Sequence, residues 1–329
     1  MQDSPKPDTD PLLSAIAARI AQASNGRAAA PRLRQGVLTV MLDVTGLPDA
    51  GRAVLEQKVR DAIGRPEGIS DVRIAQTAQK QTMRIIAVGS GKGGVGKSTV
   101  SANLAVALKR AGHKVGLVDA DIYGPSQPRL MGSEGERAQA EDKQLIPIMS
   151  RWGVPMLSMG HLVEPGRAIA WRGPMAGGAL GQLIDARWDD VDTLIVDLPP
   201  GTGDVQLSMI QKHRPTGAVI VSTPQDLALI DAARAISLFE QANVPIVGLI
   251  ENMAGYMCPH CGEMSDPFGS GGAEAEAART GAPFLGRIPL TLTIRSASDA
   301  GEPPASRDGP EGKAFAALAN RLAEWLSSQ

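Results

Sequence analysis

The chain has 329 residues, a formal net charge of -2 and a hydrophobic content of 43%. This length suits one large α/β domain, or a large domain with a small one. The balanced charge gives no reason to expect nucleic acid as a partner, and no apolar run reaches the roughly 18 residues of a membrane helix. The polar, acidic start lacks the features of a secretory signal. We therefore expect a cytoplasmic protein that acts on neither nucleic acid nor membranes.

The N-terminal quarter of the chain has the pattern of a small domain. Residues 1–11 are rich in Pro and Asp and are expected to form a disordered tail. Helical periodicity follows at 12–23 and 50–64, and strand-like segments lie at 36–44 and 68–76. This pattern predicts a small α+β domain over 12–76. The polar stretch 77–82 is interpreted as a linker.

The pattern changes after the linker. Apolar runs rich in β-branched residues recur, and most lack two-residue alternation, which is typical of strands buried on both faces of a parallel sheet. They lie at 84–89, 114–119, 192–198, 217–222, 244–250 and 284–290, with helical segments at 97–110, 203–213 and 226–242. This alternation predicts a doubly wound α/β domain with a mostly parallel sheet over 83–329. The segment 131–190 gives no clear pattern.

The stretch GSGKGGVGKST, residues 89–99, follows the first buried strand and begins a helix. From Gly91 to Ser98 it matches G-x-x-x-x-G-K-[ST], the phosphate-binding loop of P-loop NTPases. Glycines let several backbone N–H groups point at one anion. Lys97 is expected to reach the β- and γ-phosphates of ATP, and Ser98 to hold Mg²⁺. The predicted nucleotide-binding residues of the loop are Gly91, Lys92, Gly93, Gly94, Val95, Gly96, Lys97, Ser98 and Thr99. A merely flexible connector is the alternative interpretation.

Lys92 is an additional lysine near the start of this loop. The form KGGVGKS resembles the deviant loop of the dimeric ATPases that include MinD, the ParA partition proteins and the nitrogenase iron protein. The resemblance implies that Lys92 crosses a dimer interface to the partner's phosphates. A cation placed there lowers the barrier to phosphoryl transfer, as an arginine finger does. A solvated loop lysine is the alternative.

Three aspartates follow predicted strands beside the loop. Asp119 and Asp121 stand in VGLVDADIYGPS, and Asp197 stands in LIVDLPPGTGD. Carboxylates at the carboxyl ends of such strands can orient Mg²⁺ or the attacking water. By resemblance, Asp121 positions the water and Asp119 lies on the metal side, in contact through water. Asp197 fits the Walker-B position. With Lys92 and Lys97, Asp121 and Asp197 complete the predicted catalytic set.

Both cysteines of the chain lie in MCPHCGEM, residues 257–264. In a reducing compartment such a pair indicates metal or redox chemistry. The residues leave three interpretations open: Cys258 and Cys261 as half of an iron–sulfur site, a structural zinc site, or a dithiol. His260, between the cysteines, is a further candidate ligand.

The motifs KGGVGKST, DADIYGPS, VDLPPGTGD, STPQDLALIDA, IENM and CPHCG occur in the order seen in the Mrp/ApbC family of ATPases, and the match covers about residues 83–329. This resemblance implies a MinD-like fold, slow ATP hydrolysis and a four-iron, four-sulfur cluster that Cys258 and Cys261 share with their twins in a homodimer. Zinc could occupy the same thiolates. The expected partners are apo iron–sulfur proteins and cluster scaffold proteins. The resemblance also places Asn252 near the adenine.

The N-terminal region resembles a degenerate MIP18-like domain, since it has no cysteine and lacks the usual Asp-Pro-Glu motif. We therefore assign it no function. The competing interpretation of the whole chain is a MinD/ParA-like positioning ATPase that acts on membrane or DNA, with structural zinc at the cysteines.

Overall fold

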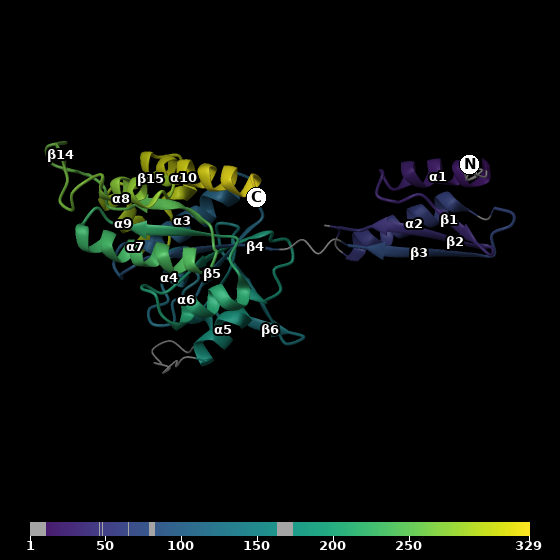
Figure 1. Ribbon diagram of the computed structural model, residues 1–329, viewed down its shortest axis with the longest axis horizontal. Helices are drawn as coiled ribbons and strands as arrows, with labels where there is room; N and C mark the ends of the chain where they lie inside the picture. The colour runs from purple at the N-terminus through teal and green to yellow at the C-terminus, as the bar shows by residue number, and fades with distance from the viewer. Residues whose placement is uncertain (1–10, 46, 48, 65, 79–82, 163–173) are drawn as a thin grey trace, which may run out of the picture. The chain divides into compact units, whose positions relative to one another are not determined.

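The computed structural model describes residues 11–45, 47, 49–64, 66–78, 83–162 and 174–329. The chain divides into two compact units between residues 82 and 83. Apart from Pro11, the tail expected at 1–11 lies outside the described residues, and so does most of the expected linker. Figure 1 shows the elements of each unit.

The small unit is an α+β domain, as the sequence pattern predicted. Its sheet has the order β1–β2–β3, with β2 antiparallel to β1 and parallel to β3. Alternate residues of β2, namely Leu38, Val40 and Leu42, are buried together with Ile16 and Ile20 of α1. The elements are α1 (Pro11–Ala23), β1 (Arg32–Arg34), β2 (Val37–Asp43), α2 (Asp49–Ile63) and β3 (Asp71–Thr77).

The large unit is built on an eight-stranded sheet of order β15–β12–β11–β4–β10–β5–β9–β8. All neighbours pair in parallel except β8, which pairs antiparallel with β9. The predicted doubly wound fold is confirmed. The strands are β4 (Arg84–Gly89), β5 (Val115–Asp119), β8 (Ile148–Met149), β9 (Pro155–Ser158), β10 (Thr193–Asp197), β11 (Gly217–Ser222), β12 (Ile246–Glu251) and β15 (Phe284–Arg287).

Helices cover both faces of this sheet, so that its central strands are buried on each side. The face with Ile86 and Leu117 packs against α3 and α10, and the face with Ala87 and Val118 packs against α5 and α7. Figure 1 shows α10 on the same side as α3, and α5 on the other. The helices are α3 (Lys97–Arg110), α4 (Gln127–Met131), α5 (Pro174–Ile184), α6 (Asp204–Ser208), α7 (Asp226–Gln241), α8 (Gly272–Thr280), α9 (Leu292–Asp299) and α10 (Pro310–Ser327).

Two segments differ from the sequence prediction. The helix expected at 203–213 is α6 followed by a π-helical turn, η2 (Met209–His213), because its backbone widens to an i→i+5 pattern. The unread segment 131–190 contains β8, β9, α5, a short turn η1 (Met159–His161) and a hairpin of β6 (Gln139–Glu141) and β7 (Gln144–Ile146). These strands have two to four residues each, too few for a period to emerge from the sequence.

Candidate nucleotide site and thiol hairpin

The phosphate loop lies where β4 ends and α3 begins, at the carboxyl edge of the parallel sheet. Strands β10 and β5 lie next to β4 in the sheet, and their last residues, Asp197 and Asp119, are paired in register. This edge of a doubly wound sheet is where ligands bind. A cavity of about 260 Å³ opens here, lined by Ser90, Lys92, Gly93, Gly94, Val95, Gly96, Lys97, Ser98, Thr99, Asp121, Ser126, Leu130 and Pro200.

Two glycines of the loop are required by their surroundings. A Cβ atom at Gly91 would lie 2.1 Å from the carbonyl carbon of Asp231 in α7, which is far inside contact distance. Gly96 has φ +79°, and a Cβ there would lie 2.2 Å from the Asn252 side-chain nitrogen. The loop is therefore packed directly against α7 and against the residue that follows β12.

Lys97 is held by the carboxylate at the end of the neighbouring strand β10. Its Nζ lies 2.6 Å from Asp197 Oδ1, and both side chains are buried. Ser101 Oγ donates a second hydrogen bond to the same oxygen at 2.9 Å. Lys97 and Asp197, two members of the predicted catalytic set, are thus brought together at the base of the cavity.

Gln127 connects this ion pair to the other carboxylate. Its Nε2 donates to Asp197 Oδ2 and to the backbone oxygen of Ser98, each at 2.9 Å. Its backbone N–H donates to Asp119 Oδ2 at 3.0 Å. The side-chain oxygen of Gln127 is buried without a hydrogen-bond partner among the described residues. Sequence reasoning missed Gln127, although it immediately follows DADIYGPS, because nothing in that motif reveals a contact with Asp197.

Asp119 is fully buried and does not line the cavity. Ser158 Oγ and the backbone N–H groups of Gln127 and Asp121 donate to its carboxylate. Burial, and then the negative charge of Asp197, raise the pKa of Asp119 from 3.8 to about 7. Its predicted metal-side role, through water, remains a prediction. In the structure its carboxylate fixes the loop that follows β5 and the first residue of α4.

Asp121 and Ser98 are two of the residues with side-chain oxygens that line the cavity. Asp121 Oδ1 accepts the backbone N–H groups of Tyr123 and Gly124 at 3.2 and 3.3 Å, so the carboxylate is held by its own loop. Ser98 Oγ lies 3.5 Å from Lys97 Nζ. A hydroxyl and a carboxylate beside a phosphate loop are hard oxygen ligands of the kind that Mg²⁺ takes together with nucleotide phosphates. The donor set therefore fits Mg²⁺.

Lys92 is part of the loop, whereas Asn252 follows β12 and contacts the loop. Lys92 is half-buried and lines the cavity, and its backbone oxygen accepts a hydrogen bond from Ser90. Asn252 is buried, and its Nδ2 donates to the backbone oxygen of Val95 at 2.8 Å. Asn252 thus braces the phosphate loop, while its predicted adenine contact stays a prediction.

The two cysteines occupy the tip of a hairpin formed by β13 (Tyr256–Met257) and β14 (Met264–Ser265). The tip is closed by hydrogen bonds from Cys258 N to Glu263 O and from Gly262 N to Cys258 O, both 2.9 Å. Cys258 is partly exposed and Cys261 is exposed, and neither forms a disulfide. Backbone N–H groups of Cys261 and His260, and the Cys261 thiol, lower the pKa of Cys258. The hairpin therefore presents a thiol pair to solvent, and Figure 1 shows it projecting from the large unit.

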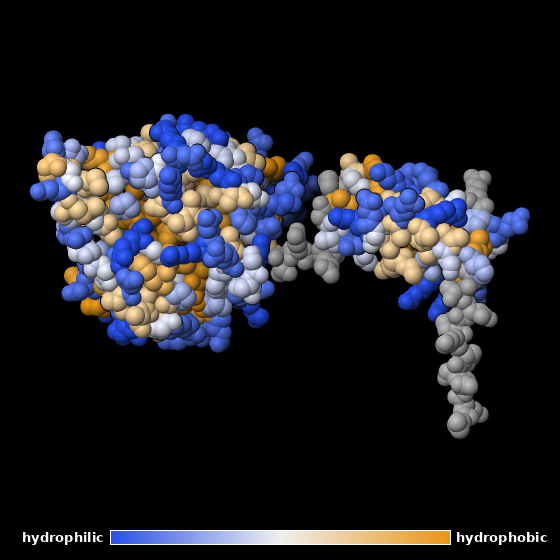
Figure 2. Space-filling model, turned by 90° about the horizontal axis from the view of Figure 1, so that it is seen from above, coloured by the Kyte–Doolittle hydropathy of each residue, from blue (hydrophilic) through white to orange (hydrophobic). Residues whose placement is uncertain are grey.

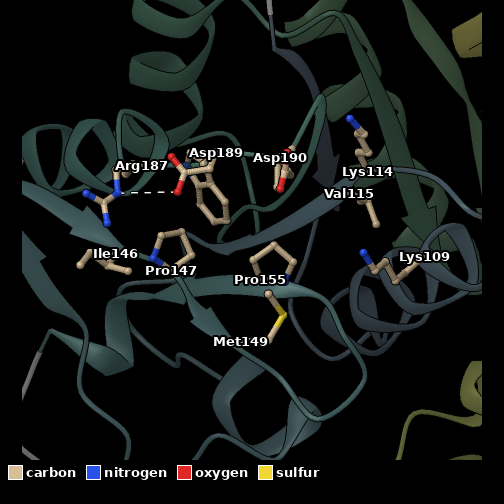
Figure 3. Close-up of a pocket in the computed structure, with 12 residues that line it drawn as sticks. Lys109, Lys114, Val115, Ile146, Pro147, Met149, Pro155, Arg187, Asp189 and Asp190 are labelled. Carbon is tan, nitrogen blue, oxygen red and sulfur yellow. Dashed lines mark ion pairs between the residues drawn. The ribbon is translucent and has the colours of Figure 1, made fainter. Parts of the chain in front are cut away.

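A second cavity, of about 300 Å³, lies near Val115, the first residue of β5. It is therefore at the amino edge of this strand, whereas the phosphate loop lies at the carboxyl edge of the sheet. Figure 3 shows Lys109 and Lys114 on one side of it and Asp189, paired with Arg187, on another. Its walls hold mixed charges around apolar residues and lack a glycine-rich loop. The cavity therefore offers no nucleotide-binding geometry and is not the predicted site.

Among the described residues, no helix combines the length and the apolar character that a membrane span requires.

Comparison with known proteins gives a consistent result. Residues 81–323 match the family model described as NUBPL iron-transfer P-loop NTPase. A protein of Haemophilus influenzae named iron-sulfur cluster carrier protein is 46% identical over 254 residues, which are 76% of this chain and 69% of that protein. The family-model match, over residues 81–323, includes both the phosphate loop and the thiol hairpin.

Solved structures give the same fold. A nucleotide-binding protein of Archaeoglobus fulgidus, in complex with ADP and with cobalt found, superposes with a TM-score of 0.61 at 40% identity over 70% of this chain and 90% of its own. The cell division ATPase MinD of Pyrococcus furiosus superposes with a TM-score of 0.55 at 26% identity over 74% of this chain and 99% of its own. The expected MinD-like architecture of the large unit is confirmed.

Proposed function

The chain belongs to the family of NUBPL iron-transfer P-loop NTPases, and from this premise we propose that it is an ATP-hydrolysing iron–sulfur cluster carrier. As a cytoplasmic homodimer, it holds a four-iron, four-sulfur cluster between two subunits and transfers it to apo-proteins. One observation carries the proposal: a short segment connects the phosphate loop to the thiol pair. Asn252, at its start, contacts the loop, and Cys258, at its end, is the first of the two accessible cysteines. The name of the Haemophilus influenzae relative, iron-sulfur cluster carrier protein, supports an iron–sulfur cluster as the cargo.

The loop residues bind and orient the triphosphate. Lys97 exchanges Asp197 for the β- and γ-phosphates, and the loop N–H groups with the start of α3 hold the remaining charge. Ser98 and Asp121 would hold Mg²⁺, which when bound neutralises charge between the phosphates. Asp121, at the rim of the cavity, orients the attacking water. Lys92 would reach a partner's phosphates across a dimer interface, and its position in the lining of the cavity supports this role.

A second copy is needed because one chain supplies only two thiolates. Four thiolates usually hold a four-iron cluster. Among the described residues, no group of three or more His, Cys, Asp or Glu gathers to hold a metal. A two-fold axis through the hairpins would bring Cys258 and Cys261 together with their twins, without any further ligand.

The large unit also has apolar surface that a second copy could cover. Leu227 and Ile230 on α7 are exposed, and they lie within a turn of Asp231, which contacts Gly91 of the phosphate loop. Figure 2 shows hydrophobic patches among hydrophilic residues on one face. Exposed apolar patches of this kind mark interaction sites. This supports a dimer interface beside the nucleotide.

The nucleotide and the thiols are coupled through the hairpin base. Asn252 binds Val95 of the loop, and the following residues are fixed to the segment after β15 by Ala254 N–Ile288 O and Leu290 N–Gly255 O hydrogen bonds. Only the short hairpin strand then separates this anchor from Cys258. A shift of the phosphate loop on ATP binding is therefore expected to change the spacing of the thiols in the dimer.

Anaerobic reconstitution with iron and sulfide tests the proposal. We expect a brown dimer with a visible absorbance band and about four irons per dimer, and loss of both in Cys258→Ala. His260→Ala is the matched control at the hairpin tip and should retain the cluster. A monomeric, colourless protein under all loading conditions would refute the carrier function. Zinc in its place, together with ATP-dependent sedimentation on liposomes or DNA, would support a positioning ATPase instead.

A further inference from the structure

The sheet of the small unit has one face that its own helices cover and one face that they leave open. Leu38, Val40 and Leu42 of β2 are buried against α1 and α2. The alternate residues of β2 lie on the opposite face, where Met41 is 44% exposed. Figure 1 shows α1 on one side of these strands. Within the small unit taken by itself, no described helix packs on the second face.

Arginines of both edge strands lie on this open face. Arg32 of β1 is paired in register with Thr39 of β2, and Thr39 is paired with Arg73 of β3. Side chains paired in this way share one face of a sheet. Because neighbouring strands lie about 4.8 Å apart, Arg32 and Arg73 begin about 10 Å from each other, on either side of Thr39. Arg34, two residues along β1 from Arg32, lies on the same face.

The positive charge of this face is largely unpaired. Arg32 and Arg34 are exposed, and within the described part of the chain their guanidinium groups have no ion-pair partner. Arg73 forms an ion pair of 3.3 Å with Asp71, in which the side chains are 72% and 55% exposed, so water screens the pair. Three arginines thus accompany a single carboxylate over these two cross-strand rows.

The charge of the face and its lack of aromatic rings indicate the class of partner. Charged edge strands also discourage pairing with other sheets, but that purpose does not require the same sign on both edges of one face. Residues 1–82 contain no Phe, Trp or Tyr, so the face offers no ring on which a nucleic-acid base could stack. A protein carboxylate needs no such ring, because arginine binds it through two parallel hydrogen bonds. The face therefore fits an acidic protein.

We propose that the open sheet face of the small unit binds an acidic surface of a second protein through Arg32, Arg34 and Arg73. The guanidinium groups pair with the carboxylates of that protein around the neutral residues of β2, and added salt weakens the contact. Under the proposed carrier function, the protein that docks here is the apo-protein that receives the cluster. This last statement rests on the proposed function, whereas the docking does not.

Fluorescence anisotropy of a labelled oligoglutamate peptide, titrated with the full cluster-free chain, tests the docking face. We expect binding that weakens as salt is raised. At about 0.15 M salt, where charges beyond about 8 Å are screened, the double variant Arg32→Glu, Arg34→Glu should weaken binding by about tenfold, because two attractions become repulsions. The double variant Arg19→Glu, Lys58→Glu makes the same change in net charge on α1 and α2 and should bind like the parent.

A third variant is expected to act in the opposite direction. Asp71→Asn removes the carboxylate from the face and should tighten binding about twofold, a gain that a merely structural role of the arginines would not produce. Circular dichroism of each variant checks the fold. Equal losses in the two double variants would overturn the proposal. Tighter binding of single-stranded DNA than of a peptide of equal charge would overturn the assignment of a protein partner.

The identity of the partner is tested separately with cluster-loaded dimer. Transfer to an apo-ferredoxin of negative net charge should be slower from the Arg32→Glu, Arg34→Glu variant than from the parent, at equal cluster content and an equal rate of ATP hydrolysis. Equal transfer rates, together with weakened peptide binding, would overturn the acceptor assignment alone. A parent chain that takes up no cluster would overturn the carrier function and this assignment with it, while the peptide titration would still decide the docking face.

Discussion

Lys97 and Asp197 lie 100 residues apart in the sequence and form an ion pair of 2.6 Å in which the side chains are 6% and 0% exposed. The lysine that should bind phosphate is therefore neutralised by the aspartate expected near Mg²⁺. A buried pair of this kind is costly to break from one side only. The ion pair therefore fixes the position of the Lys97 ammonium group relative to β10.

Asp197→Ala should destabilise the nucleotide-free large unit by about 3–5 kcal/mol, because Lys97 is left buried and unpaired. The double variant Lys97→Met, Asp197→Leu removes both charges and should recover most of that loss, although it cannot bind ATP. Urea unfolding measures both. A double variant no more stable than Asp197→Ala would show that the ion pair is not the cause.

Gln127→Leu should lower the free energy of unfolding by about 1–3 kcal/mol, since Asp197 Oδ2 and the Ser98 carbonyl lose their donor. It should also weaken binding of Mg²⁺–ATP. The same change at Gln144, which is exposed on β7, is the control and should stay within about 0.5 kcal/mol. Equal losses in the two variants would contradict the bridging role of Gln127.

Gly91→Ala places a methyl group 2.1 Å from the Asp231 carbonyl carbon and must push the phosphate loop away from α7. The rate of ATP hydrolysis, measured as phosphate released, should fall by about 100-fold. This is the loss expected when reacting groups are misplaced by about 1 Å. At Gly178, on α5 and outside the cavity, a Cβ would meet no atom within 4 Å. Gly178→Ala should therefore stay close to the parent, and a comparable loss there would refute the packing argument.

Asp119 gives stability a pH dependence of definite sign. The folded chain holds the Asp119 proton up to a pKa of about 7, whereas the unfolded chain releases it near 3.8. Its contribution to the free energy of unfolding therefore falls as pH rises between these values. Asp119→Asn should flatten this part of the profile in urea titrations across that range. Asp190→Asn, at an exposed position, controls for loss of a carboxylate. An unchanged slope in Asp119→Asn would reject the assignment.

Cys258 should react with iodoacetamide at lower pH than an ordinary thiol of pKa 9.0, because backbone N–H groups stabilise its thiolate. In Cys261→Ala only Cys258 remains to be alkylated. Its midpoint should rise somewhat as the Cys261 thiol is lost, yet stay below that of the same variant in urea. Identical midpoints in the folded and unfolded states would show that the hairpin does not perturb Cys258.

Much of the large unit could be predicted because buried parallel strands have a distinctive composition. The run at 217–222 is β11 to the residue, and the strand at 84–89 is β4. The secondary structure of the segment 131–190 could not be predicted from the sequence. Its strands are short, and its residues are held by contacts with residues far away in the chain. Arg187, for example, pairs with Glu141 of β6, and its backbone N–H donates to Leu145. Such contacts leave no periodic trace.

The amino-acid sequence by itself determined the phosphate loop, the buried strands outside the segment 131–190 and the identity of the thiol pair. Backbone freedom at glycine and burial on both faces of a strand restrict which residues can stand at these positions. Only the tertiary structure decided which groups meet. It paired Lys97 with Asp197, placed Gln127 between two carboxylates, buried Asp119 away from the cavity and turned Asn252 toward the loop. The reason is physical: hydrogen bonds and desolvation depend on distances across the fold, which local sequence does not specify.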